Sequence, residues 1–393
     1  MVQARNKQVQ SRPMPRIHTP VRLAVLCALA LAAITSVQAE RRLANGWEVR
    51  SEITLPAGVD PSAVRDFFPT FQDYIDTVLF HPSAGYYSSG RVDFYSHYRT
   101  FPIALAPSFG QMIAEQIFRM WDGMRKAGSL SPTEKFTIAE FGPGNGALAE
   151  SILNYIDSQA ARNVGLWREF SRQVVYASYD RSPALSDLQT KRNSRFRDRF
   201  EARVADATNP GATIPSGSLK GVVLSNELLD CFSVHKVALG DDGSAEVGYV
   251  VPSFWRSDWE KLRAALPASV RELVSRDDTA IHQRLLAPKR APAAPEAADR
   301  VYLSRTAFNG VLEAISKRTT YEMEVNKLQF QELYVPVSVT PEVAVHIRRY
   351  ASVYANRLAR AGLGLVTYVS PGERAFIQGA GAALKAGYVI TID

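Results

Sequence analysis

The feature that most constrains the fold is an apolar segment that runs into a glycine-rich turn and then into an amphipathic helix. Phe136–Phe141 predicts a buried strand, Gly142 to Gly146 a tight turn, and Leu148–Ile156 a helix. Glycines adopt backbone conformations that other residues avoid, and they let a ligand approach the main chain at a helix N-terminus. This order predicts the first unit of an α/β nucleotide-type fold.

The segments that follow alternate between expected strands and helices. Strands are expected over Gln173–Tyr179, Glu201–Val204 and Gly221–Leu224, with a helix over Pro183–Lys191. Strands and helices that alternate in this way form a parallel sheet with helices on both faces. We therefore predict an α/β fold whose core, residues 131–234, is a doubly wound, Rossmann-like sheet.

Helical segments are expected before this core. Residues 40–130 contain two apolar periodic stretches, Pro61–Phe80 and Pro107–Lys126, which predict an N-terminal helical region.

A large insert is expected after the core. Residues 235–370 interrupt the alternation, with expected strands at Glu246–Val251 and Leu333–Val337 and helices over Pro341–Ala361. The Ala- and Pro-rich stretch 287–298 predicts a flexible linker within the insert. Residues 371–393 then return to the core with a last helix and a last strand.

The first 39 residues have the composition of a targeting segment. They contain five basic and no acidic residues, and the uncharged apolar run Leu23–Val37 precedes the small-residue pattern Val37-Gln38-Ala39. This pattern favours a secretory signal peptide, with a mitochondrial or plastid transit peptide as the main alternative and an uncleaved anchor as a further one. The run is short for a membrane span, so we expect no stable one.

Charge and cysteine content exclude several classes of protein. Without the leader, 41 basic residues stand against 39 acidic ones, so the nearly neutral body predicts no nucleic-acid partner. One of the two cysteines, Cys27, lies in the leader, which leaves only Cys231 in the body. A disulfide framework and a cysteine-based zinc site are therefore excluded, and we predict no metal.

The residue before the glycine turn indicates which ligand the turn binds. The spacing of Gly142, Gly144 and Gly146 is G-x-G-x-G, and Glu140 ends the preceding strand. A carboxylate there would repel a pyrophosphate but would suit the ammonium group of S-adenosylmethionine (SAM). The pattern favours SAM as the cofactor over a nicotinamide dinucleotide. The alternative is a tight turn with a structural role only.

Two further acids follow the next expected strands. Asp180 ends the second strand, where a carboxylate can accept hydrogen bonds from both ribose hydroxyls of an adenosine. Asp206 follows the third strand and could face the adenine amino group. Either acid could instead cap a helix or a turn.

A third polar cluster, Asn226-Glu227-Leu228-Leu229-Asp230, follows the strand Gly221–Leu224. Methyl transfer from a sulfonium is a direct displacement, so positioning of the acceptor dominates catalysis. Asn226, Glu227 and Asp230 are the candidate catalytic residues, because carboxylates could orient a guanidinium and offset its charge. The alternative is a helix start that Asn226 caps.

Taken together, five motifs resemble the MidA-like family of SAM-dependent methyltransferases. They are His81-Pro82-x-x-Gly85-Tyr86-Tyr87, Phe109-Gly110-Gln111, Glu140-x-Gly142-Pro143-Gly144-x-Gly146-x-Leu148, Ser182-Pro183-x-Leu185 and Asn226-Glu227-x-x-Asp230. Mitochondrial members of that family assemble respiratory complex I and symmetrically dimethylate an arginine. The resemblance implies a class I methyltransferase fold with a substrate-side insert and a protein arginine as the methyl acceptor.

Two expectations qualify this resemblance. The family continues beyond the Ile-Asp pair at which this chain stops, so the sheet is expected either to lack its last strands or to close in another way. A non-catalytic assembly or binding protein that retains the fold is therefore the alternative function. A nicotinamide-linked oxidoreductase is disfavoured by Glu140 and by the glycine spacing.

Overall fold

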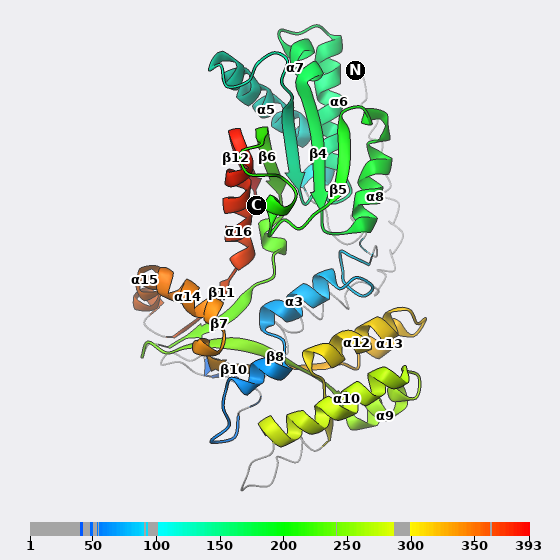
Figure 1. Ribbon diagram of the computed structural model, residues 1–393, viewed down its shortest axis with the longest axis vertical. Coiled ribbons are helices and arrows are strands. Elements are labelled where there is room, and N and C mark those ends of the chain that lie inside the picture. Colours follow the sequence, from blue (N-terminus) through cyan, green and yellow to red (C-terminus); the bar gives the residue numbers. More distant parts are fainter. Residues whose placement is uncertain are drawn as a thin grey trace, which may run out of the picture.

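The computed structural model describes residues 40–41, 48–49, 53, 55–89, 92, 101–240, 242–286, 299–361 and 364–393. Its upper half in Figure 1 is a five-stranded parallel sheet with the strand order β12-β6-β3-β4-β5. The strands are β3 (Phe136–Phe141), β4 (Val174–Asp180), β5 (Phe200–Val204), β6 (Leu219–Asn226) and β12 (Leu384–Ile392). The strand order reverses between β3 and β6, and open α/β sheets bind ligands at such a reversal.

Helices cover both faces of this sheet. One face packs against α5 (Ser108–Lys126), α6 (Ala147–Ala161) and α7 (Trp167–Gln173), and the other packs against α16 (Pro371–Ala383). Helix α8 (Pro183–Arg192) lies beside β4 and β5, and the short α4 (Phe101–Ala104) precedes α5. The predicted doubly wound α/β fold is confirmed.

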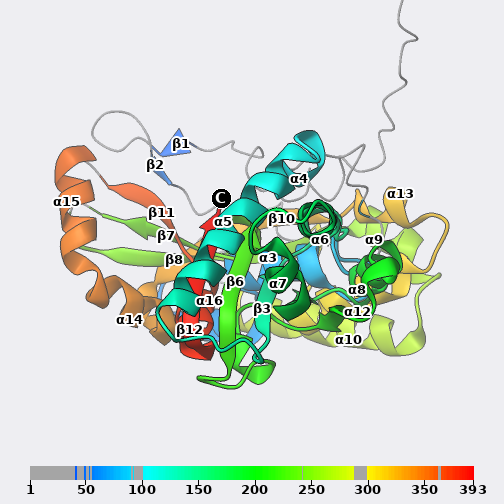
Figure 2. The ribbon, with the colours of Figure 1, turned by 90° about the horizontal axis from the view of Figure 1, so that it is seen from above.

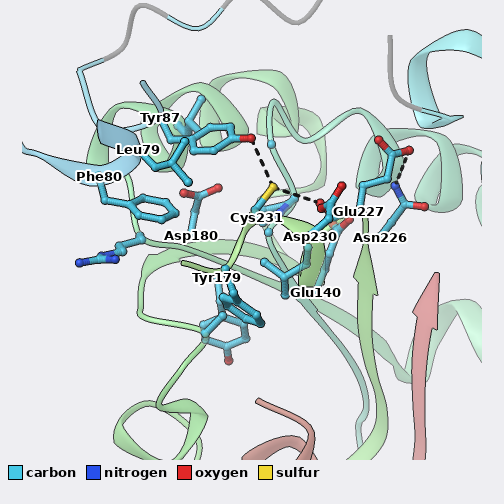
Figure 3. Close-up of a pocket in the computed structure, with 18 of the residues that line it drawn as sticks. Leu79, Phe80, Tyr87, Glu140, Tyr179, Asp180, Asn226, Glu227, Asp230 and Cys231 are labelled. Atoms are coloured by element: carbon cyan, nitrogen blue, oxygen red, sulfur yellow. Dashed lines mark hydrogen bonds between the residues drawn. The ribbon is translucent and has the colours of Figure 1, made fainter. Parts of the chain in front are cut away.

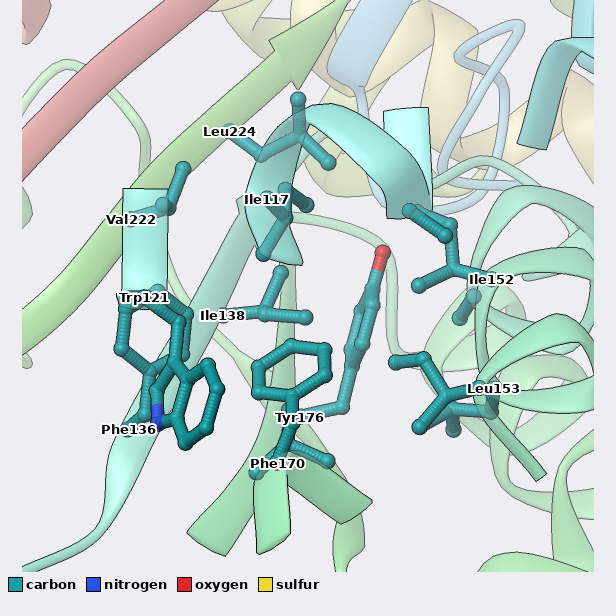
Figure 4. Packing of buried hydrophobic residues seen from close by; sticks show 14 of the residues in the cluster. Ile117, Trp121, Phe136, Ile138, Ile152, Leu153, Phe170, Tyr176, Val222 and Leu224 are labelled. Atoms are coloured by element: carbon teal, nitrogen blue, oxygen red, sulfur yellow. The ribbon is translucent and has the colours of Figure 1, made fainter. Parts of the chain in front are cut away.

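The larger of the two cores surrounds Tyr176 on the α5–α7 face. Figure 4 shows its ring among Ile138, Phe170, Ile152 and Leu153. Tyr176 is 1% exposed, and its hydroxyl points out of the cluster. Burial of apolar surface at about 25 cal/mol per Å² makes this cluster a main source of stability.

A second, antiparallel sheet occupies the insert. Its strand order is β10-β8-β7-β11, and β9 also pairs with β8. The strands are β7 (His235–Leu239), β8 (Ala245–Trp255), β9 (Arg300–Tyr302), β10 (Gln329–Pro336) and β11 (Leu365–Val369). Because side chains alternate along β8, Val250 and Phe254 enter one apolar cluster, whereas Val247, Tyr249 and Val251 enter another on the opposite face.

The insert also supplies its own helices. These are α9 (Arg256–Arg263), α10 (Ala268–Ile281), α12 (Arg305–Ser316), α13 (Tyr321–Val325), α14 (Pro341–Arg349) and α15 (Ala351–Ala361). Short helical turns are η1 (Ser194–Phe196), η2 (Pro210–Ala212), η3 (Leu229–Cys231), η4 (His282–Leu286) and η5 (Val337–Val339). Figure 2 shows α14 and α15 at one side of the molecule and α10, α12 and α13 at the other.

The first two helices pack against the antiparallel sheet. Helix α2 (Ala63–Phe67) and helix α3 (Phe71–Phe80) place their apolar side chains in the two clusters of the insert, not in the core of the parallel sheet. Figure 1 shows α3 between the two sheets. A capping box between Thr70 and Asp73 fixes the start of α3. Before these helices, β1 (Glu40–Arg41) pairs with β2 (Glu48–Val49).

One predicted helix is wrong as a single element. Pro61–Phe80 is interrupted at Phe68, whose backbone is extended. The next residue is Pro69, and a proline disfavours the helical conformation of the residue before it. The helices expected over Pro341–Ala361 are present as α14 and α15, which are separated at Tyr350. The predicted targeting segment 1–39 and the linker 287–298 lie outside the described residues.

Candidate functional site

A cavity of about 370 Å³ opens at the carboxyl ends of β3, β4, β5 and β6. Eight of the nine predicted site residues line it: Glu140, Gly142, Gly144, Asp180, Asp206, Asn226, Glu227 and Asp230. Gly146 does not line it. Figure 3 shows Glu140, Asp180 and Asn226 projecting from neighbouring strand ends.

The glycine turn adopts the backbone that its sequence predicts. Gly142, Gly144 and Gly146 have φ values of +70°, +54° and +77°, in the left-handed region that favours glycine. A Cβ at Gly142 would lie 2.8 Å from a methyl carbon of Leu228, and one at Gly146 would lie 2.9 Å from the amide nitrogen of Asn193. Gly146 is the N-cap of α6 and contributes to the shape of the turn without lining the cavity, whereas Gly142 and Gly144 line it.

Glu140 is a buried carboxyl at the floor of the cavity. Alternation along β3 places it on the same face as Phe136 and Ile138, and it is 2% exposed. The hydroxyl of Tyr176 donates a hydrogen bond of 2.7 Å to Glu140 Oε2. Burial raises the pKa of Glu140 to about 7, against the opposite effect of Tyr176.

Asp180 is the second buried carboxyl. Its Oδ1 accepts the backbone N–H of Ser182 at 2.8 Å, and its Oδ2 accepts the side-chain amide of Gln189 at 3.2 Å. Burial raises the pKa of Asp180 to about 6, although both hydrogen bonds oppose this shift. A carboxylate has about four lone-pair positions, so two remain for a ligand with neighbouring hydroxyls.

Asp206 is exposed and follows β5. Its Oδ1 accepts the N–H and the hydroxyl of Thr208 at 2.8 and 2.7 Å. Asp206 therefore caps a turn, which was the alternative role considered for it from the sequence. The same carboxyl also lines the cavity.

The residues after β6 combine burial with an unusual backbone. Asn226 is 7% exposed, and its Oδ1 has no hydrogen-bond partner among the described residues. Glu227 has φ +49°, which is uncommon for a residue with a side chain and occurs preferentially at functional sites. Its N–H donates to the carbonyl of Ile392 at 2.8 Å, so strand β12 holds this conformation in place.

Asp230 lies in η3 and is exposed, whereas the neighbouring Cys231 is partly buried. Burial raises the pKa of the Cys231 thiol to about 12, so the thiol stays protonated. The hydroxyl of Tyr87 lies 3.3 Å from Cys231 Sγ, and Figure 3 shows this contact across the cavity. Cys231 and Tyr87 were not among the predicted site residues.

A second wall of the cavity comes from α3 and the loop after it. Asp76 of α3 forms a bidentate ion pair with Arg181, whose guanidinium also stacks 4.6 Å over the ring of Phe80. Ring stacking between Phe80 and Tyr87 continues this wall. Since Arg181 directly follows Asp180, the ion pair fastens α3 to the end of β4.

The wall depends on one glycine of the motif His81 to Tyr87. A Cβ at Gly85 would lie 2.4 Å from the backbone nitrogen of His81, so only glycine permits this turn. The turn sends the chain back along α3, where the N–H groups of Tyr86 and Tyr87 donate to Val78 and Leu79. The motif was visible in the sequence, but its place beside the cavity depends on tertiary packing.

The lining residues fit SAM. A buried carboxyl at Glu140 suits an ammonium group, Asp180 has free lone pairs for ribose hydroxyls, and Gly142 and Gly144 leave room for close approach. Asn226 Oδ1, which accepts no hydrogen bond from the residues that the structure describes, offers one more acceptor. Within the part of the chain that the structure describes, no group of three potential ligands could hold a metal ion, and no helix is long and apolar enough to cross a membrane.

A curated protein resembles this chain over about half of its length. The chain is 30% identical over 231 residues to the protein arginine methyltransferase NDUFAF7 homolog, mitochondrial, of Drosophila melanogaster. That match covers 53% of this chain and 46% of the fly protein, so the chain spans about half the length of this curated relative.

Two crystal structures from Burkholderia thailandensis also match. A COG1565 superfamily member bound to S-adenosyl-homocysteine is 25% identical with a TM-score of 0.35, over 61% of this chain and 50% of that one. A native structure of a COG1565 superfamily protein is 19% identical with a TM-score of 0.35, over 96% and 98% of the two chains.

A family model matches residues 112–393, which is more than half of the chain and includes the whole parallel sheet. Its description is "Putative S-adenosyl-L-methionine-dependent methyltransferase". The match confirms the resemblance that the five motifs predicted and the cofactor, SAM, that Glu140 and the glycine turn favoured. The chain belongs to this family of SAM-dependent methyltransferases.

Proposed function

We propose that this chain transfers a methyl group from SAM to a guanidinium nitrogen of a protein arginine. The observation that carries the proposal is the charge of the cavity. Six acids line it, and Arg181 is the one basic residue among the described lining residues. Arg181 is paired with Asp76, so the remaining lining groups that can carry a charge are acids, which favour cationic ligands.

SAM brings the reactive methyl group on its sulfonium together with an ammonium group. Glu140 would pair with the ammonium, Asp180 would accept the ribose hydroxyls, and Asp206 would face the adenine amino group. Gly142 and Gly144 would let the ligand approach the main chain. Gly146 would keep the turn in shape at the start of α6.

Glu227 and Asp230 would hold the acceptor. An arginine presents a planar fork of N–H donors that pairs with carboxylates, and its ordinary pKa keeps it protonated. As the new N–C bond forms and the S–C bond breaks, the nitrogen must lose a proton, which one of these carboxylates would accept. Asn226 would orient Glu227, because its side-chain amide lies 3.4 Å from Glu227 Oε1.

The fly relative supports arginine as the acceptor, because its name describes a protein arginine methyltransferase. It also supports mitochondrial import of the first 39 residues over secretion, the destination that the apolar pattern alone favoured. A role in complex I assembly rests on the family resemblance. Fusion of residues 1–45 to a fluorescent reporter would distinguish the two destinations.

Calorimetry and a transfer assay on the full chain test the proposal. We expect SAM to bind and radiolabelled methyl groups to appear on a peptide with one arginine, and not on the same peptide with lysine in its place. SAM binding without transfer to any arginine peptide would favour a binding protein that retains the fold. Absence of binding at millimolar SAM would exclude the cofactor site itself.

A further inference from the structure

Gln189 is a buried glutamine that none of the motifs includes. It lies on α8, which follows β4 and precedes β5 in the sequence, and 0% of its surface is exposed. Its side-chain amide contacts two residues of the cavity, Gly144 and Asp180, although Gln189 does not itself line the cavity. We propose that Gln189 is a positioning residue that couples the glycine turn to the carboxylate of Asp180.

The hydrogen bonds of Gln189 fix the orientation of its amide. Nε2 donates to the carbonyl of Gly144 at 2.9 Å and to Asp180 Oδ2 at 3.2 Å. Oε1 accepts the hydroxyl of Ser178, on β4, at 2.9 Å. If the amide were flipped, its oxygen would face the Gly144 carbonyl and the Asp180 carboxylate, which are both acceptors. Only one orientation therefore satisfies all three partners.

The bond to Gly144 sets the direction of the peptide that follows it. A trans peptide is planar, and its C=O and N–H groups point in opposite directions. Because the Gly144 carbonyl is turned toward Gln189, the N–H of Asn145 points away from Gln189. Gly144 and Asn145 both line the cavity, so this bond controls which backbone groups the turn presents to SAM.

The bond to Asp180 fixes the plane of its carboxylate. Ser182 holds one oxygen and Gln189 holds the other, which leaves the outer lone pairs for the ribose. Gln189 also helps Asp180 to stay ionised, because hydrogen bonds from an amide lower the pKa that burial raises. One side chain thus aligns two parts of the cofactor site that lie 36 residues apart in sequence.

The chain contains a matched control. Gln173 is a second buried glutamine with the same pattern, one accepted and two donated hydrogen bonds. Its partners are the indole N–H of Trp121 and the carbonyls of Ser131 and Glu134, none of which lines the cavity. Loss of either amide removes the same number of hydrogen bonds, but only Gln189 contacts the candidate SAM site.

This inference rests on the proposed function, and calorimetric titration of SAM between pH 5.5 and 8.5 tests both. In Gln189→Glu, a carboxylate would face the Gly144 carbonyl and the Asp180 carboxylate. We expect the dissociation constant to rise at least about tenfold at pH 7.5, and the rise in affinity with pH to shift upward as the pKa of Asp180 increases. The neutral Gln189→Met should weaken binding less and without the shift.

The control variant Gln173→Glu should lower the melting temperature about as much as Gln189→Glu does. Its dissociation constant for SAM should stay within about twofold of the wild-type value, and its affinity should depend on pH as in the wild type. SAM binding in both Gln189 variants with wild-type affinity and pH profile would overturn the inference while leaving the proposed function intact. An equal loss of affinity in Gln173→Glu would overturn it too, because general destabilisation would then explain the effect. A wild type that does not bind SAM would overturn the proposed function and this inference together.

Discussion

Tyr176 and Glu140 come from adjacent parallel strands, and the hydroxyl of Tyr176 donates a 2.7 Å hydrogen bond to the Glu140 carboxyl. The ring of Tyr176 belongs to the main apolar core, whereas Glu140 lines the cavity. The core therefore supplies a donor that helps a fully buried acid to ionise near neutral pH.

Removal of this donor should shift the pH dependence of SAM binding. In Tyr176→Phe the pKa of Glu140 rises above its wild-type value of about 7, because the hydrogen bond that lowers it is lost. We expect several-fold weaker SAM binding at pH 7 and recovery at pH 8.5, measured by calorimetry. Equal affinity of the two proteins at both pH values would show that Glu140 does not pair with the ammonium.

The contribution of Glu140 and Asp180 to the free energy of unfolding should fall as pH rises from about 4 to 7. Glu140 and Asp180 have folded-state pKa values of about 7 and about 6, above their ordinary values of 4.5 and 3.8, so the folded state holds protons more tightly. Their contribution to stability is complete below the ordinary values and is lost as pH rises through the folded-state values. For Glu140 the loss is on the order of 3 kcal/mol.

Urea denaturation of the wild type and of Glu140→Gln across this range isolates the effect. The variant should lose less stability between pH 5 and pH 8, because its amide does not titrate. If the difference between the two proteins were constant with pH, Glu140 would not have a raised pKa.

Gly144→Val should abolish SAM binding. A valine at φ +54° is strained, and its side chain would occupy the approach to the turn. We expect a loss of at least about 100-fold in affinity by calorimetry. Gly128→Val is the matched control, because Gly128 also has positive φ but has open space around it and does not line the cavity. Unchanged affinity in Gly144→Val would show that the turn has a structural role only.

Glu227→Gln should spare SAM binding and slow methyl transfer. The amide retains the shape of the side chain but can neither offset the charge of a guanidinium nor accept its proton. We expect kcat for an arginine peptide to fall by about 10²-fold or more, with the SAM dissociation constant within about twofold of the wild type. Loss of SAM affinity would instead assign Glu227 to the cofactor site.

Gly221→Ala should destabilise the parallel sheet. Gly221 has φ +146°, and a Cβ there would lie 2.0 Å from the carbonyl oxygen of Thr137 on β3. We expect the free energy of unfolding to fall by about 3 kcal/mol or more in chemical denaturation. Gly381→Ala in α16, where nothing lies within 4 Å, should be neutral or stabilising. Similar effects of the two variants would contradict the close approach of β3 and β6.

The parallel sheet and the cofactor side of the cavity could be predicted because their signals are local. The apolar strand before Gly142 and the helix after Gly146 specify a strand–turn–helix unit from neighbouring residues alone. The alternation that follows places Glu140, Asp180 and Asn226 at strand ends. Parallel strands bring such ends to one edge of the sheet, whatever the loops between them do.

The other wall of the cavity could not be predicted, because it depends on contacts between distant segments. Asp76 and Arg181 are 105 residues apart, and nothing near either residue indicates their ion pair. Tyr87 and Cys231 are 144 residues apart, and their contact depends on the turn at Gly85. The left-handed backbone of Glu227 has no sequence signal either, since glycine or asparagine would be the expected residue there.

Helix α3 belongs to two parts of the molecule at once. Its apolar side chains are buried with the antiparallel sheet, while Asp76, Leu79 and Phe80 face the cavity at the parallel sheet. A ligand that tightens this wall should therefore protect amide hydrogens in β7 and β8, which α3 contacts, from exchange with solvent. The stability of the insert thus becomes a remote reporter of cofactor occupancy.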